Sequence, residues 1–386
     1  MDDDEVPHRY DDGNRAFLQA FLARGTLTFK EAQPILAAIF SALDRREHGE
    51  QAEPTAAADV TQQDFESYVG AASAAASPFD MEIRSIAHQT TRERVYALVN
   101  TTSDPVTQLA TLHSAEEIAF VRRVIDAIFD KYNTPRMEML CIDGMQANKL
   151  RSVPRGGNGG EENENGNGND STIIGDDNSN ENGNGEGAAT ATQTVGGLKG
   201  LKSSEVENVL RSMVESGWFE RSRAGFYSLS PRALMELRSW LTDAYNDADV
   251  DAGDKTTWQR VKFCEACREV VTVGQRCAER DCLVRMHDAC AEAFWQGNAR
   301  RNARGGAATN GNGGARACPR CSREWTGRNF VGERAVTEME AYQRGKRRSG
   351  RGGGRTSIVE EIVEEAQEGE GEEEEDADGD EDEDAE

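Results

Sequence analysis

The chain has 386 residues, enough for two or three domains, but only 37% of it is hydrophobic and 6% aromatic. The formal net charge of −26 comes from two low-complexity segments, 156–193 and 360–386, which hold 8 and 18 acidic residues and no basic ones. The remaining residues balance at 44 acidic and 44 basic, so the folded part is close to neutral. The first residues lack a basic start and an apolar core, and no apolar run approaches about 18 residues. We therefore expect neither a signal peptide nor a membrane span.

Residues 14–135 carry the signals of four helices. Thr28 with Glu31, and Ser114 with Glu117, are capping-box patterns that predict the starts of the second and fourth helices. The other two helices are predicted from apolar residues at helical spacing: Phe17, Leu18, Phe21 and Leu22, and then Phe65, Tyr68 and Val69.

Two strand-like runs, Met81–Ala87 and Arg94–Asn100, are separated by a polar stretch and predict a hairpin between the third and fourth helices. Helices with a two-stranded hairpin are the layout of a winged helix, a helix-turn-helix variant. We predict a winged helix at 14–135. A small α+β domain with no DNA role is the alternative.

Residues 136–248 predict a second winged helix that is interrupted by the linker 156–193. The linker repeats Gly, Asn and Glu with almost no apolar residues, so it cannot repay its ordering entropy and is expected to be disordered. The first helix of this domain is expected near 137–150, ahead of the linker. After it, a helix is predicted to begin at Ser203 or Ser204, then two short strands, then a helix capped by Ser230 with proline at its first position.

Seven of the eight cysteines cluster in the C-terminal third, while Cys141 stands among apolar neighbours and is expected to be buried. With one histidine, the seven form four pairs at metal-binding spacing, C-x2-C, C-x4-C, H-x2-C and C-x2-C. Eight such ligands suffice for two tetrahedral zinc ions, whereas buried free cysteines would need no such spacing. A zinc finger is therefore predicted at 258–330, with these ligands: Cys264, Cys267, Cys277, Cys282, His287, Cys290, Cys318 and Cys321.

The ligand order, four cysteines, one histidine and three cysteines, suits both RING and PHD fingers. Both families are cross-braced, so that the first and third pairs share one ion and the second and fourth pairs share the other. Pro319 after the seventh ligand, and Phe294 with Trp295 on a helix predicted at 291–296, favour a RING. PHD fingers usually carry an aromatic residue where this chain has Arg316. A non-enzymatic PHD-like chromatin reader, or a scaffold with structural zinc, stays open as the alternative.

Three separated segments resemble one known family. They are Arg285-Met-His287 in the finger, the helix Arg15–Arg24, and the stretch from Glu215 through Arg232. All three are similar to the RING subunit of the SMC five/six complex, the non-structural maintenance of chromosomes element one family. The resemblance implies an α+β multidomain fold, with two winged helices followed by a variant RING. It also implies a nuclear, chromosome-associated complex that acts in DNA repair and recombination.

The resemblance further implies a MAGE-type partner, a kleisin partner and E3 ubiquitin-protein transfer. A RING holds an E2 with thioester-linked ubiquitin so that a substrate lysine can attack, which is catalysis by positioning without a covalent catalytic residue. The usual E2 contacts of active RINGs fall on Ala266, Trp295 and Pro319. Because Ala266 is small, transfer is expected to depend on a partner.

The remaining expectations concern partners and the tail. The apolar face of Phe17, Leu18, Phe21 and Leu22 is wider than a small domain needs, and we expect part of it to dock a partner. Residues 258–330 hold 13 basic against 7 acidic residues, so phosphate contact with DNA is a third reading. Residues 345–386 are predicted to be disordered, basic and then acidic. Within them, 358–363 resembles a SUMO-interacting strand, with a short frayed helix as the alternative.

Overall fold

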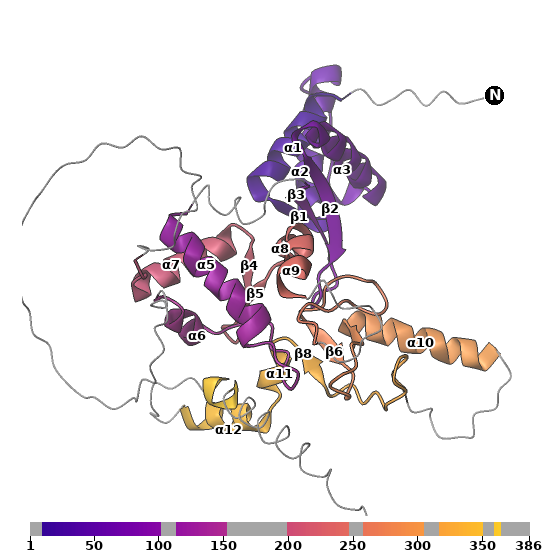
Figure 1. The fold of residues 1–386 in the computed structure, drawn as a ribbon. Coiled ribbons are helices and arrows are strands. Elements are labelled where there is room, and N and C mark those ends of the chain that lie inside the picture. Colours follow the sequence, from indigo (N-terminus) through magenta and orange to yellow (C-terminus); the bar gives the residue numbers. More distant parts are fainter. Residues whose placement is uncertain are drawn as a thin grey trace, which may run out of the picture.

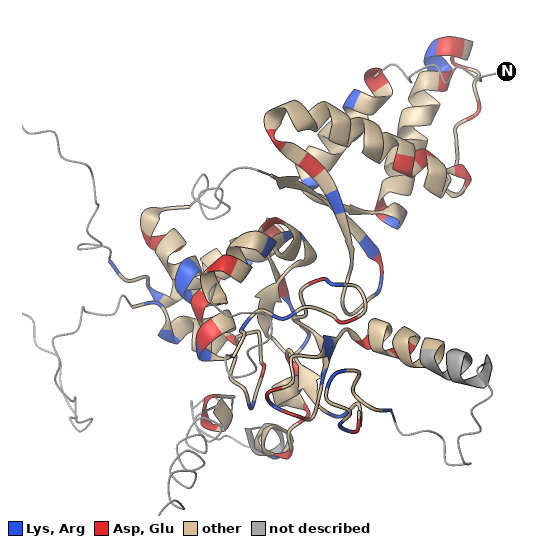
Figure 2. Cartoon of the chain, turned by 45° about the vertical axis from the view of Figure 1, so that its right-hand side comes forward, with Lys and Arg blue, Asp and Glu red and all other residues tan. Residues whose placement is uncertain are grey.

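The computed structural model describes residues 10–101, 113–152, 199–246, 258–304, 316–349 and 359–363 (Figure 1). The predicted linker at 156–193 and the acidic segment after 363 lie outside the described residues. Basic and acidic residues are interspersed over the described part (Figure 2), as its near-balanced composition predicts. None of the helices in these ranges combines the length and apolar character that crossing a membrane requires.

The first unit packs three helices against a small antiparallel sheet of order β1-β3-β2. The predicted hairpin is confirmed with its bounds, and the capping boxes at Thr28 and Ser114 are both present. The three-residue strand β1 was too short for its sequence to predict. The elements are α1 (Asp12–Arg24), β1 (Thr26–Thr28), α2 (Phe29–His48), η1 (Ala57–Asp59), α3 (Gln62–Ala76), η2 (Ser77–Phe79), β2 (Met81–Ala87) and β3 (Arg94–Asn100).

Helix α5 packs with the elements of the second unit, whereas the sequence predicts it within the first domain, 14–135. Phe120, Val124 and Ile125 of α5 are buried in the same core as Val209 and Leu210 of α7, whereas the first core is built from residues between 17 and 98. We therefore propose that the first unit ends near residue 100. The elements are α5 (Ala115–Asp126), the π-helical turn η3 (Ala127–Lys131), α6 (Gly144–Lys149), α7 (Ser203–Glu215), β4 (Phe219–Arg221), β5 (Tyr227–Leu229), α8 (Pro231–Glu236) and α9 (Arg238–Tyr245).

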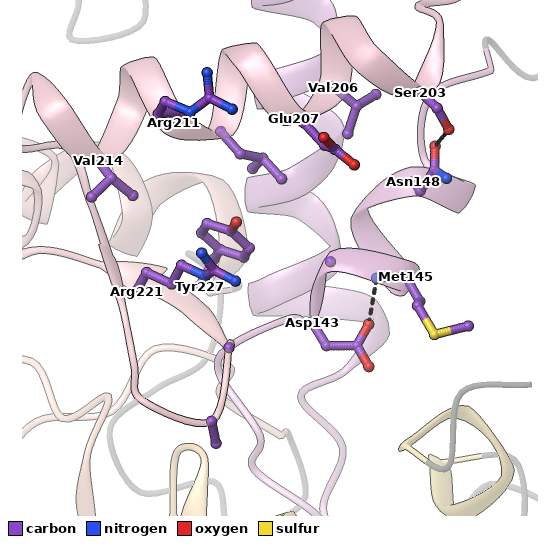
Figure 3. A pocket seen from close by; sticks show the side chains of 14 residues that line it. Asp143, Met145, Asn148, Ser203, Val206, Glu207, Arg211, Val214, Arg221 and Tyr227 are labelled. Atoms are coloured by element: carbon purple, nitrogen blue, oxygen red, sulfur yellow. Dashed lines mark hydrogen bonds between the residues drawn. The ribbon is translucent and has the colours of Figure 1, made fainter. Parts of the chain in front are cut away.

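The two sides of the linker meet in the second unit. The Leu201 amide donates to the Arg151 carbonyl at 3.1 Å, and the Ser203 hydroxyl donates to Asn148 Oδ1 at 2.8 Å. A groove of about 700 Å³ opens beside this junction, between α6, α7 and the β4–β5 hairpin (Figure 3). Its lining mixes apolar side chains with Glu207 and Arg221.

The C-terminal part is a three-stranded sheet of order β7-β6-β8 with flanking helices. Helix α10 is longer than the predicted 291–296, and residues 345–349 continue α12, so the expectation of disorder is wrong there. Residues 359–363 form a buried helical turn, in agreement with the helical alternative for that segment. The elements are β6 (Gly274–Arg276), β7 (Arg285–Met286), α10 (Asp288–Arg304), β8 (Phe330–Val331), α11 (Arg334–Thr337) and α12 (Glu340–Ser349).

Both junctions around the second unit are packed. Ile86, Ala97 and Val99 of the first unit's sheet pack with Met235 of α8, which lies under the β2–β3 hairpin in Figure 1. The C-terminal sheet has no separate core among the described residues, because Val271 and Val331 belong to the same buried cluster as α5 and α7. The finger and the second unit therefore form one continuous hydrophobic core.

Candidate metal centre

Two C-x2-C turns present four of the predicted ligands, and both have the same backbone geometry. In the first turn, the Arg268 amide donates to the Cys264 carbonyl at 2.9 Å, and in the second the Ser322 amide donates to the Cys318 carbonyl at 3.0 Å. Arg268 and Ser322 both adopt positive φ, 62° and 59°. Each tight turn aims two thiols to the same side, as a tetrahedral metal site requires.

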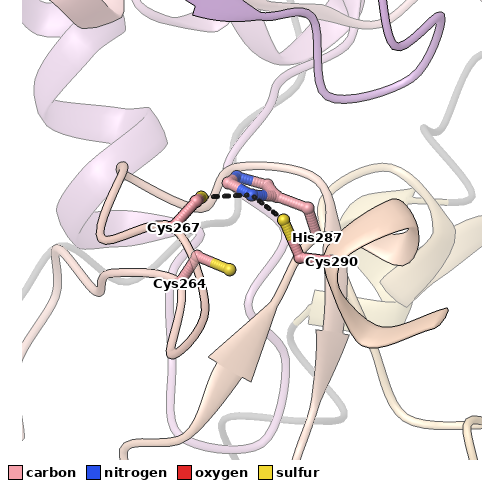
Figure 4. Close-up of side chains that lie close together, drawn as sticks. All are labelled: Cys264, Cys267, His287 and Cys290. Carbon is pink, nitrogen blue, oxygen red and sulfur yellow. Dashed lines mark hydrogen bonds between the residues drawn. The ribbon is translucent and has the colours of Figure 1, made fainter. Parts of the chain in front are cut away.

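The first ligand group consists of Cys264, Cys267, His287 and Cys290, whose ligand atoms all lie within 4.8 Å of one another (Figure 4). His287 Nδ1 lies 3.4 Å from Cys267 Sγ and 3.8 Å from Cys290 Sγ. His287 Nε2 faces the Val270 carbonyl oxygen at 3.2 Å. A proton on Nε2 would donate to that carbonyl and leave the Nδ1 lone pair directed at the thiols. This arrangement fits a zinc site of three cysteines and one histidine.

The second ligand group consists of Cys277, Cys282, Cys318 and Cys321, again within 4.8 Å. Cys277 and Cys321 sulfurs are 3.4 Å apart, and Cys282 and Cys318 sulfurs are 3.6 Å apart. The pairs therefore combine as first with third and second with fourth, the cross-braced arrangement. The two Cys/His clusters could hold two zinc ions.

The protonation of the thiols bears on how a metal would bind. Burial raises the pKa of Cys282 to about 11 and that of Cys290 to about 12. Burial also acts on Cys264, but hydrogen bonds, first among them one with His287, lower the pKa of its thiol to about 6. Since zinc binds thiolate, loading these sites releases protons.

A buried ionic cluster that the sequence did not reveal fixes the finger on the second unit. Glu138 is 1% exposed and accepts from Arg285, which is fully buried, with a distance of 2.8 Å from Nε to Oε2. Arg285 also donates to the carbonyl of the ligand Cys282 at 2.5 Å and to that of Val284 at 2.9 Å. Burial alone would raise the pKa of Glu138, but the nearby charges, first that of Arg285, lower it to about 2. The carboxylate is therefore ionised at neutral pH.

A second unpredicted contact comes from Gln89, in the turn between β2 and β3. Its amide nitrogen donates to the Val270 carbonyl at 3.0 Å, and its oxygen accepts from the Thr272 and Val273 amides at 3.0 and 2.8 Å. The Val270 carbonyl is also the partner of His287 Nε2. The hairpin of the first unit thus reaches the outer shell of the first ligand group.

The three predicted E2-contact residues differ in their exposure to solvent. Ala266 and Pro319 are exposed. Trp295 is only 9% exposed, and its ring lies 5.9 Å from that of Trp325. Trp295 therefore packs within the finger, and the E2 contact predicted for it stays a prediction.

The four residues of the predicted docking face also differ in their exposure to solvent. Phe17 and Phe21 are fully buried in the first core, and their rings stand edge to face 6.0 Å apart. They are therefore not available on the surface. Leu18 is half-buried and Leu22 is 56% exposed, so only these two remain candidates for docking. Cys141 is buried, as expected.

Comparison with known proteins places the chain in a family. Residues 14–237 match the family described as Nse1 non-SMC component of SMC5-6 complex, and residues 264–303 match a RING-like domain. A Xenopus laevis protein called Non-structural maintenance of chromosomes element 1 homolog is 28% identical over 127 residues, 33% of this chain and 36% of that protein. The Pongo abelii protein of the same name is 21% identical over 317 residues, 81% of this chain and 84% of that protein.

A solved structure also has the same fold. A chain from an Nse1-Nse3-Nse4 complex matches with a TM-score of 0.52 and 19% identity, covering 84% of this chain and 99% of that one. The family match spans more than half of the chain, from the first helix through α8. The chain therefore belongs to the family of Nse1 non-SMC components of the SMC5-6 complex.

Proposed function

We propose that this protein is a RING-type E3 ubiquitin-protein ligase subunit of an SMC5-6 complex, nuclear and chromosome-associated, acting in DNA repair and recombination. The observation that carries the proposal is the cross-braced pairing of eight ligands, the first six of them within the RING-like match, in a chain of this family. The two ligand groups bind zinc and fix the loops that carry Ala266 and Pro319. These exposed residues contact the E2, and the chain contributes by positioning rather than by a covalent intermediate.

The family also suggests the partners. A solved relative comes from an Nse1-Nse3-Nse4 complex. We infer a MAGE-type partner of the Nse3 kind and a kleisin partner of the Nse4 kind for this chain. The helices and hairpins of the first and second units serve as winged helices in this assembly. Leu22, a large apolar side chain that is 56% exposed, is the contact we assign to the MAGE-type partner.

Ubiquitin transfer by the reconstituted complex tests the catalytic part. We expect Ala266→Asp to lower transfer at least about tenfold, because it places a charge where the E2 docks, while two zinc ions per chain are retained. Ala224→Asp makes the same change at an exposed alanine in the turn between β4 and β5, and should transfer like the wild type. Absence of transfer with every E2 tested, or equal rates for both variants, would contradict the proposal.

Partner docking is tested separately by binding. Leu22→Glu should weaken association with the MAGE-type partner at least about tenfold and leave the folding of the first unit intact, because Leu22 is exposed. Gln19→Glu, at a neighbouring exposed position of α1, should bind normally. If Leu22→Glu binds as tightly as the wild type, α1 is not the docking face.

A structural scaffold is the second candidate, and one observation favours it. Trp295, which occupies the usual E2-contact position on the central helix, is buried against Trp325. A finger with this contact missing would hold the complex together without transferring ubiquitin. The transfer assay with Ala266→Asp separates the two functions.

A further inference from the structure

An arginine-rich groove lies where the second unit meets the finger. It has a volume of about 590 Å³, and its lining includes five arginines and one acidic residue, Glu338. We call it the arginine groove and define it by Arg136, Arg276, Arg280, Arg328 and Arg334. Arginine is the side chain best suited to binding carboxylate and phosphate, because its planar fork donates two parallel hydrogen bonds. The groove is therefore suited to an anionic ligand.

Two of these arginines are held in place by the fold. Arg276 donates to the carbonyls of Pro135 and Arg136 at 2.6 and 2.7 Å. Arg334 stacks over the Phe330 ring at 3.7 Å and donates to Asp288 at 2.8 Å. The groove thus has two fixed guanidinium groups in its wall.

The other arginines of the wall face solvent to a greater degree. Arg280 and Arg328 are exposed, and Arg136 is half-buried. Within the described part of the chain, the Arg328 guanidinium has no hydrogen-bond partner. The Arg328 guanidinium can therefore pair with an incoming anion without first breaking a buried contact.

A segment of the chain's own tail is already seated beside the groove. Val359, Ile362 and Val363 are 3%, 4% and 2% exposed, and Ile362 lines the groove. Glu360 forms an ion pair with Lys149 of α6. This buried turn fixes the point from which the rest of the tail departs.

The next residues along the chain are acidic. Residues 364–386 hold 16 acidic residues and no basic ones, beginning with Glu364 and Glu365. Glu364 follows Val363 directly in the chain, two positions after Ile362 of the groove lining. The covalent connection alone therefore tethers the acidic segment close to the arginine groove.

We propose that the arginine groove is an anion-binding site that the acidic segment 364–386 of the same chain occupies. Carboxylate–guanidinium pairs supply the attraction, and the buried turn at 359–363 supplies a short tether. Such a tether gives the acidic segment an effective concentration in the millimolar range at the groove. The tail thereby excludes other polyanions, and this exclusion weakens as salt screens the pairs.

The test uses the full-length chain and a fluorescent synthetic peptide of residues 364–386. The first protein is the wild type, and the second has every acidic residue of 364–386 replaced by Gln or Asn. We expect the neutral-tail protein to bind the peptide at least tenfold more tightly than the wild type at low salt. The difference should disappear at high ionic strength.

Two further neutral-tail proteins assign the binding to the groove. Arg280→Glu with Arg328→Glu should abolish peptide binding, because both are exposed groove residues. Arg211→Glu with Arg223→Glu makes the same change in charge at exposed positions outside the arginine groove and should retain binding. Equal peptide binding by wild-type and neutral-tail proteins overturns the proposal, as does equal loss in both arginine pairs. A neutral-tail protein that binds a duplex oligonucleotide but not the peptide also overturns it.

Discussion

The Glu138 carboxylate sits among three basic side chains at the boundary between the second unit and the finger. Arg285 pairs with it directly, while Lys262 and Arg276 lie 3.5 and 3.6 Å away. Burial lowers the pKa of Lys262 to about 7, which relieves part of the excess positive charge. One carboxylate therefore compensates a buried arginine whose backbone contacts reach the second ligand group.

Replacing Glu138 by Gln should destabilise the protein strongly. Arg285 would remain buried without its counter-ion, and breaking such a buried pair costs about 3–5 kcal/mol. Chemical denaturation followed by tryptophan fluorescence measures the change. Glu279→Gln, which removes the partner of Arg323 on the surface, should change stability far less, because solvent screens an exposed pair. Similar losses of unfolding free energy in both variants would show that the buried ion pair contributes no more to stability than the exposed one.

Gln89 should act as a positioning residue for the first ligand group. Gln89 holds the Val270 carbonyl, which is the outer-shell partner of His287 Nε2, and disturbing such a partner typically lowers metal affinity about 10–100-fold. We expect Gln89→Ala to weaken cobalt binding at the first ligand group while the second, all-cysteine group is unchanged, as judged by the distinct visible spectra of the two sites. Gln89→Glu should weaken it as well, because a carboxylate cannot donate to the Val270 carbonyl.

The control for Gln89 lies on the same hairpin. Arg92→Ala removes an exposed ion pair with Glu292 on α10, and should leave both cobalt sites unchanged. If Gln89→Ala weakens the two sites equally, Gln89 only holds the units together.

Residue-scale prediction from the sequence succeeded where the spacing itself carries the chemistry. Four pairs of soft ligands in 58 consecutive positions, from Cys264 to Cys321, can be read without a structure. Glu138 and Gln89 had no such signature, because a single Glu and a single Gln are ordinary surface residues until tertiary contacts bury them. Phe17 and Phe21 were predicted as docking residues but lie in the core. Helical spacing identifies an apolar face but cannot tell whether that face packs inside the domain or against a partner.

At the scale of elements, α10 is held at its N-terminal end and packed along its first turns. Gln275 links the Trp325 indole to Asp288, the first residue of α10, at 3.0 and 2.8 Å. The Asp288 carboxylate also accepts a hydrogen bond from Arg334. Trp295 then packs on Trp325 from the second turn of the helix. Helix α10, Trp325 and α11 are therefore linked through Gln275 and Asp288.

Trp295→Ala should unfold or loosen the finger rather than remove a surface contact. Replacing a buried tryptophan by alanine costs about 3–5 kcal/mol, so both folding and zinc retention should suffer. Thermal unfolding with zinc release to a chromogenic chelator measures this. Phe294→Ala, at the adjacent half-buried position, should cost less. A Trp295→Ala protein with normal stability and no ubiquitin transfer would instead support the predicted E2 contact at Trp295.

Element prediction was strongest where local chemistry is decisive. Ser230 caps α8 through the Ala233 amide, with proline at the first helical position, as the sequence predicts. Capping boxes and the Met81–Asn100 hairpin are equally local signals. The packing of α5 with α7 was not predictable in this way, because the choice between two cores is made by tertiary contacts rather than by the amphipathic pattern.

At the scale of the whole molecule, zinc removal should unfold more than the finger. Structural zinc contributes an apparent 10–16 kcal/mol or so in small zinc domains, which rivals the entire stability of a domain of about 5–15 kcal/mol. Since the finger and second unit share one core, chelation should loosen both, while the separate first core persists. Hydrogen exchange measured by segment is the test.

Two results bear on that expectation. Metal analysis should give two zinc ions per chain before chelation, from the two ligand groups. After chelation, amides of α5 and α7 should exchange faster, whereas those of α1 and α3 should keep their protection. Unchanged protection in α7 would mean that the second unit is stable by itself despite the shared core.

The hydrogen bonds that join Arg151 to Leu201 and Asn148 to Ser203 also determine how well the fold tolerates changes in the segment between them. These bonds hold the two ends of the segment 152–200 together within the second unit. The segment is therefore an insertion whose ends are fixed by the domain itself. Each doubling of a flexible insertion costs only about 0.6 kcal/mol. Lengthening, shortening or replacing the insertion should therefore be nearly neutral for folding, and a fluorescent protein or affinity tag placed there should leave both cores and both ligand groups undisturbed.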